Sequence, residues 1–174
     1  LWRTESQGEP LTSLDISPDG RVLASASGFV HTTIHIWDTA TAEILKQLEG
    51  HTLWVSDVAF TRDGRRLISA AGDQTIRFWD TSTGTESQEP LHGHTDEAWA
   101  IAISEAAQLI ASVSRDGDLK LWTVDGKRAA NGYRRLSESP WGGDVQPLDH
   151  SRVLLLSPGQ PPEVGDVKSH SPFV

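Results

Sequence analysis

The chain contains no cysteine and no methionine, and its aromatic residues include only one tyrosine and four phenylalanines. Without cysteine it forms neither disulfide bonds nor thiolate metal sites, and its redox compartment stays undetermined. Its longest fully apolar runs, such as 98–103 and 153–156, are far shorter than the ~18 residues that a membrane helix needs. Since no secretory signal is visible either, we expect a cytoplasmic protein that does not contact membranes. The opening at Leu1, without an initiator methionine, predicts an excerpt of a longer protein.

Acidic residues outnumber basic residues. The 15 lysines and arginines stand against 24 aspartates and glutamates, which gives a formal net charge of −9. A chain with this balance repels phosphate backbones and anionic surfaces. Nucleic acid is therefore excluded as an expected partner, and the charge favours basic partners instead.

Tryptophan is the abundant aromatic residue, with seven copies, and several of them recur at a fixed spacing. The triplet Gly-His-Thr occurs at 50–52 and again at 93–95, and each histidine precedes a tryptophan, Trp79 or Trp122, by 28 residues. Trp37, Trp79 and Trp122 follow one another at intervals of 42 and 43 residues. Self-similarity at this period is the signature of a repeat protein.

Each repeat carries the alternation of polar and apolar residues that is typical of half-buried strands. Leu14 and Ile16 correspond to Val58 and Phe60, and then to Ile101 and Ile103, so we expect all six to be core residues. Turn signals such as 18–20 separate the strands, and each repeat is predicted to hold four. The equivalent third-strand residues His35, Arg77 and Lys120 are interpreted as a solvated stripe.

A fourth, degenerate repeat is predicted from spacing alone. The second strand of each repeat begins at Arg21, Arg65, Gln108 and Arg152, at successive intervals of 44, 43 and 44 residues. The segment around Arg152 has lost both the Gly-His pair and the tryptophan. We place this repeat at about 144–168.

The Gly-His, Asp-Gly and Trp-Asp pairs, recurring with a period of 42–44 residues, resemble the WD-repeat (WD40) family. The resemblance implies an all-β fold in which residues 1–174 form a β-propeller segment with blades of four antiparallel strands. Approximate blades are 11–49, 50–92, 93–136 and the degenerate 144–168, with 1–10 as the tail of a preceding blade or a closing strand. About four blades make a partial or small propeller, so either missing blades or a second copy of the chain would complete the ring.

The resemblance also implies a structural network that joins a loop histidine, a second-strand serine, a turn aspartate and a third-strand tryptophan. It maps onto the third repeat as His94, Ser114, Asp116 and Trp122. The second repeat supplies His51, Asp73 and Trp79 but has Ala71 at the predicted serine position. The first repeat keeps only Ser27 and Trp37. Such a network satisfies buried polar groups and builds the scaffold without performing chemistry.

No catalytic constellation is visible in the sequence. Gly-x-Ser-x-Gly and phosphate-binding glycine loops are absent. The pairs His31/His35 and His92/His94 lack a third convergent ligand, so we expect neither a metal nor a cofactor. A propeller that binds metal or substrate for catalysis would need the histidines to converge in one channel.

Binding is the remaining function. In the resembled family one propeller rim, built by inter-blade loops and second turns, is the usual docking surface, and Leu53, Trp54, Asp96 and Glu97 lie there by position. Trp54 is either an interface anchor or a cover for a blade edge. We expect a non-enzymatic scaffold that binds a protein or peptide. The alternative is a regulatory or sensor propeller within a larger signalling enzyme, a kinase or an NTPase.

Overall fold

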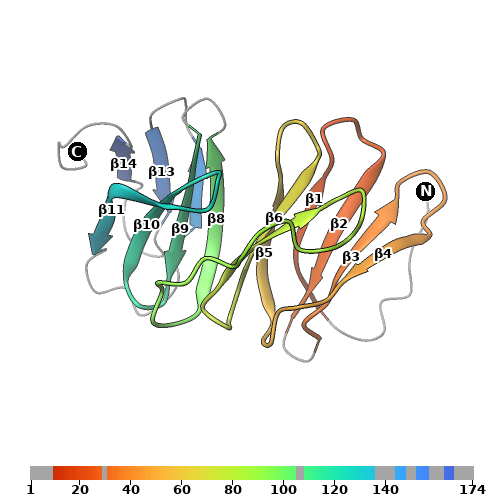
Figure 1. The fold of residues 1–174 in the computed structure, drawn as a ribbon, viewed down its shortest axis with the longest axis horizontal. Coiled ribbons are helices and arrows are strands. Elements are labelled where there is room, and N and C mark those ends of the chain that lie inside the picture. Colours follow the sequence, from red (N-terminus) through yellow and green to blue (C-terminus); the bar gives the residue numbers. More distant parts are fainter. Residues whose placement is uncertain are drawn as a thin grey trace.

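Four antiparallel sheets, arranged side by side, make up the structure (Figure 1). This computed structural model describes residues 10–28, 31–104, 108–135, 144–147, 152–156 and 163–166, and side chains as far as residue 127. Every element within these ranges is a strand. The fold is therefore all-β, as predicted.

The sheets follow one another along the chain. The first contains β1 (Leu11–Ile16), β2 (Val22–Ser27), β3 (Ile34–Asp38) and β4 (Ile44–Leu48). The second contains β5 (Val55–Phe60), β6 (Arg66–Ala71) and β7 (Ile76–Asp80). The third contains β8 (Ala98–Ser104), β9 (Leu109–Ser114), β10 (Asp118–Thr123) and β11 (Arg128–Arg135). The last contains β12 (Asp144–Pro147), β13 (Arg152–Leu156) and β14 (Glu163–Asp166), all within the range of the degenerate repeat.

The turns that join first and second strands explain why the chain reverses where it does. Gly20 and Gly64 have φ angles of 72° and 67°, in a region that glycine enters without steric cost. The preceding carboxylates hold these turns: Asp19 Oδ1 accepts a hydrogen bond from the Ser17 hydroxyl at 2.7 Å, and Asp63 Oδ1 accepts one from the Thr61 hydroxyl at 2.7 Å. The same local chemistry therefore closes both hairpins.

The second sheet differs from the prediction of four strands. Its outer segment runs beside β7 and pairs with it at two isolated bridges, Ile76 with Leu91 and Trp79 with Glu86. Between the two bridges Ser87 N donates to Phe78 O at 2.9 Å, but no regular ladder forms. Pro90 lies in this stretch, and proline is disfavoured inside a regular strand.

The first strands of successive sheets lie next to each other, β1 beside β5, β5 beside β8 and β8 beside β12 (Figure 1). Apolar side chains fill the space between sheets. One core joins the first and second sheets, and another joins the second and third. Asp57 adds polar links across three sheets, because it accepts hydrogen bonds from the Ser13 hydroxyl at 2.8 Å and from Ile101 N at 2.9 Å.

The sheets form an open, partial propeller. The prediction that Leu14 and Ile16 are core residues is therefore wrong. Val58, Phe60 and Ile101 are buried as expected, but Leu14 is 56% exposed and Ile16 is 57% exposed. The side chains of Val58 and Phe60 pack against the preceding sheet, whereas no described sheet packs on the corresponding face of the first sheet. Within the described ranges the structure also holds no helix of the length and apolarity that crossing a membrane requires.

Candidate functional site

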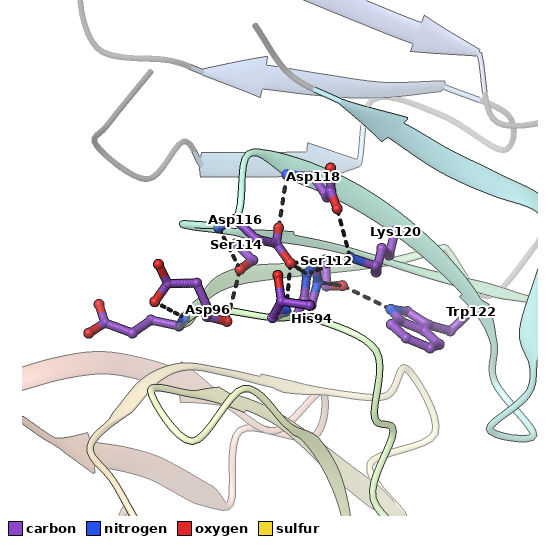
Figure 2. A network of polar contacts seen from close by, with 10 residues as sticks. His94, Asp96, Ser112, Ser114, Asp116, Asp118, Lys120 and Trp122 are labelled. Carbon is purple, nitrogen blue, oxygen red and sulfur yellow. Dashed lines mark hydrogen bonds and ion pairs between the residues drawn. The ribbon is translucent and has the colours of Figure 1, made fainter. Parts of the chain in front are cut away.

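A relay of buried polar side chains links the loop before β8 to the interior of the third sheet (Figure 2). His94 Nδ1 lies 3.0 Å from Asp116 Oδ2, and His94 Nε2 lies 2.8 Å from the Ser112 hydroxyl. Trp122 Nε1 donates a hydrogen bond to the same hydroxyl at 2.8 Å. The Asp116 carboxylate can only accept, so His94 Nδ1 carries the N–H of the imidazole. The indole N–H of Trp122 can only donate, so the Ser112 hydroxyl accepts it and donates its own proton to His94 Nε2.

The second sheet repeats this relay one period earlier. His51 Nδ1 lies 2.8 Å from Asp73 Oδ2, and His51 Nε2 lies 2.7 Å from the Ser69 hydroxyl. Trp79 Nε1 donates to Ser69 at 2.8 Å. Both imidazole rings stand edge-on to their tryptophans, with centroid separations of 6.0 and 6.2 Å. Two equivalent loops are thus held by the same arrangement of groups.

The predicted serine positions were wrong by two residues. Ser112, and not Ser114, completes the third-sheet relay, while the Ser114 hydroxyl donates to the backbone oxygen of Asp96 at 2.9 Å. Side chains two apart on a strand share one face, so the alternation could not choose between the two serines.

The other sheets show the same shift. Ser69 takes the role expected at Ala71, so the second-sheet relay is complete. In the first sheet, Trp37 Nε1 donates to Ser25 Oγ at 2.7 Å, and the hydroxyl of Ser27 points to Thr33 O at 3.4 Å.

Burial and hydrogen bonding set the ionisation of the relay. Burial favours the neutral carboxyl of Asp116, but hydrogen bonds from Thr95 N and His94 outweigh it and lower its pKa to about 2. For Asp73, burial likewise opposes ionisation, and contacts with His51 and Thr75 hold its pKa well below the usual range. Burial lowers the pKa of His94. The third-sheet relay therefore pairs a charged Asp116 with a neutral His94 near pH 7.

Lys120 is a further member of the third-sheet site that the sequence interpretation missed. It was expected on a solvated stripe, but it is only 3% exposed. Its ammonium lies 3.2 Å from Asp116 Oδ2 and 3.0 Å from Asp118 Oδ2 (Figure 2). A buried lysine requires such compensation. Asp118 and Lys120 alternate on β10 and share one strand face, and Asp116 lies in the turn just before them. This acid-acid-lysine spacing was the available signal.

The connectivity of serine, histidine and aspartate matches that of a hydrolase triad, which is recognised by geometry. The surroundings are different. Ser69 and Ser112 are fully buried, and each already accepts an indole N–H. A substrate carbonyl has no route to either oxygen, so the arrangement stabilises structure. In the described part of the chain, no group of three or more His, Asp or Glu side chains is placed to hold a metal.

The predicted rim residues lie on the loops that the relays anchor. We define the rim as residues 50–54, 72–75, 92–97 and 115–117, which lie at one end of the second and third sheets. Leu53 is 43% exposed. Trp54 is half-buried and lies on Gly72, where an added Cβ would meet the indole at 2.8 Å.

The acidic rim residues lie together at the start of β8. Asp96 Oδ1 accepts the hydrogen bond of Glu97 N at 2.9 Å, and Glu97 lies 3.6 Å from the guanidinium of Arg115. The rim thus combines apolar and acidic side chains on loops that are hydrogen-bonded to the two relays.

Comparison with known proteins agrees with this architecture. A family model described as "WD domain, G-beta repeat" matches residues 3–38, 42–80 and 85–123. The chain is 38% identical to nuclear distribution protein PAC1-2 of Uncinocarpus reesii, over 62% of the chain and 28% of that protein. It is 33% identical to a periodic tryptophan protein 2 homolog of Neurospora crassa, over 83% of the chain and 17% of that protein. It is 34% identical to human WD repeat and SOCS box-containing protein 1, over 59% of the chain and 25% of that protein. The chain therefore spans less than a third of each of these relatives.

Proposed function

The chain belongs to the WD-repeat family, and from that premise we propose that it is a non-enzymatic scaffold whose rim binds a protein or peptide partner. One observation carries the proposal. The loops that present the rim are tied to the buried relays by their own backbones, since Thr52 N donates to Asp73 at 3.0 Å and Thr95 N donates to Asp116 at 2.8 Å. A surface held in place before binding loses less conformational entropy when a partner docks.

The matched substitutions Leu53→Asp and Leu45→Asp test this function. Leu53 lies on the rim and Leu45 on β4, and the two are 43% and 49% exposed, so the chemical change is the same at both. Affinity capture from an extract of the source organism, read by quantitative mass spectrometry, should recover a partner with wild type and Leu45→Asp but not with Leu53→Asp. Equal recovery with both variants would argue against rim binding.

We also propose that a further blade covers the open face of the first sheet. Leu14 and Ile16 correspond in register to residues that a neighbouring sheet buries elsewhere in the molecule. Light scattering on this chain should give a monomer near 19.0 kDa, leaving the face for a blade. A dimer that Leu14→Lys dissociates would instead make the cover a second copy. A cytoplasmic location stays a prediction.

A further inference from the structure

The first strands of three sheets carry a bulge at the same place. In β1, Leu11 pairs with Ser27 and Ser13 pairs with Ala26, so Thr12 is the extra residue. The same register shift leaves Ser56 extra in β5 and Trp99 extra in β8. Bulges redirect a side chain away from the regular ladder, and they are frequent beside functional sites.

Two of the three bulge residues link neighbouring sheets. The Thr12 hydroxyl donates to Val55 O at 2.5 Å, and the Ser56 hydroxyl donates to Ala98 O at 2.5 Å. Each therefore joins its own sheet to the first strand of the next one. A small hydroxyl side chain is sufficient for this structural role.

Trp99 departs from that pattern. An indole occupies the equivalent position in the third sheet, and it is 39% exposed. It lies two residues beyond the rim loop 92–97, at the same end of the sheet. An exposed tryptophan on a rigid strand is a typical anchor residue of protein interfaces. It was not among the predicted rim residues, although Thr12, Ser56 and Trp99 follow one another in the sequence at intervals of 44 and 43 residues.

We propose that Trp99 is the contact residue for an arginine- or lysine-rich peptide segment that docks on the rim. The proposal rests on the function proposed above and names the chemistry of the partner. Arginine stacks well on the indole face, and Asp96 and Glu97 supply negative charge three and two residues before Trp99. The net charge of −9 attracts such a peptide from a distance.

Glu97 offers the peptide a second contact. Its present partner, Arg115, has a side chain that is 51% exposed, and the two groups are 3.6 Å apart. The Glu97 side chain is itself 20% exposed, and a long, partly solvated pair of this kind is weak. A peptide cation can therefore replace Arg115 at Glu97 at little cost.

Fluorescence anisotropy with a labelled peptide of alternating arginine and serine tests the proposal at physiological ionic strength. Trp99→Ser installs the type of residue that Thr12 and Ser56 already provide, and it leaves the net charge unchanged. We expect this variant to bind about three- to thirtyfold more weakly than wild type, and Trp99→Phe to retain most of the affinity. A peptide with citrulline in place of arginine should bind weakly to all three proteins. Equal affinity of wild type and Trp99→Ser for the arginine peptide would overturn the proposal.

Trp99→Leu covers the case in which Trp99→Ser does not fold, since leucine keeps apolar bulk but has no π face. Loss of arginine-peptide binding by a folded Trp99→Leu supports the proposal, and full retention contradicts it. The scaffold function is tested separately by the Leu53→Asp capture experiment. If capture depends on Leu53 while peptide binding does not depend on Trp99, the scaffold function stands and the Trp99 proposal fails.

Discussion

Replacing Ser112 with alanine removes one hydroxyl that two buried side chains share. The substitution takes the acceptor from Trp122 Nε1 and the donor from His94 Nε2, both now at 2.8 Å. A buried polar group left without a partner costs roughly 1–3 kcal/mol, so the two together predict a loss of about 2–6 kcal/mol. That is a large fraction of the ~5–15 kcal/mol stability of a typical protein.

Urea unfolding, followed by tryptophan fluorescence and circular dichroism, measures the effect. With an m-value of about 2 kcal/mol/M, the midpoint of Ser112→Ala should fall by about 1–3 M. Ser114→Ala is the matched control, since it is the same change two residues along the same strand. It removes hydrogen bonds to Asp96 O and from Asp116 N. Both partners are backbone groups of partly exposed rim residues that water can reach, so the loss should be smaller, about 1 kcal/mol.

The comparison of the two alanine variants decides between the two registers of the relay. Ser69→Ala in the second sheet should behave like Ser112→Ala, because its hydroxyl makes the equivalent contacts to His51 and Trp79. If Ser114→Ala proves as damaging as Ser112→Ala, or more so, the relay described here does not account for the stability of the third sheet.

Three further predictions concern packing, links between sheets and pH. Gly72→Ala should push the indole of Trp54 outward, lower the free energy of unfolding by about 1–3 kcal/mol and weaken partner capture. An unchanged urea midpoint together with unchanged capture would show that residue 72 does not contact Trp54 in solution. Asp57→Ala should cost about 1–3 kcal/mol, seen as a lower urea midpoint, because it removes links to two other sheets; an unchanged midpoint would contradict this. Acid should lower the stability of the fold in two stages. The pKa of His94 is below 6.5 in the folded state, so as pH falls below 6.5 the unfolded state binds a proton first and the free energy of unfolding decreases. The ionised Asp116 carboxylate stabilises the fold above about pH 4, and this contribution is lost as pH falls toward its folded pKa of about 2. Urea midpoints across pH, with Asp116→Asn as the control that flattens the lower stage, check the last prediction.

Local chemistry and periodicity were enough to determine the repeat architecture from the sequence. Turn residues such as Asp63 and Gly64 close hairpins through contacts within a few residues, so they act in the same way wherever they occur. Alternation identified the strands, the spacing of the tryptophans identified the repeats, and the resemblance to the WD-repeat family implied a relay between His94 and Trp122. These features depend on neighbours along the chain, and neighbours along the chain are what a sequence displays.

Only the tertiary structure decided which side chains are buried and which groups they contact, because both depend on how neighbouring sheets pack. Leu14 and Val58 occupy equivalent positions in equivalent strands, yet one is exposed and the other buried, because burial requires a second surface. Ser112 and Ser114 share a strand face, and only the position of the indole selects between them. Lys120 is buried because two carboxylates converge on it, and Trp99 stands out only once the three bulges are superimposed. The sequence determined which side chains point to the same side, and the packing of the sheets determined what each of them meets there.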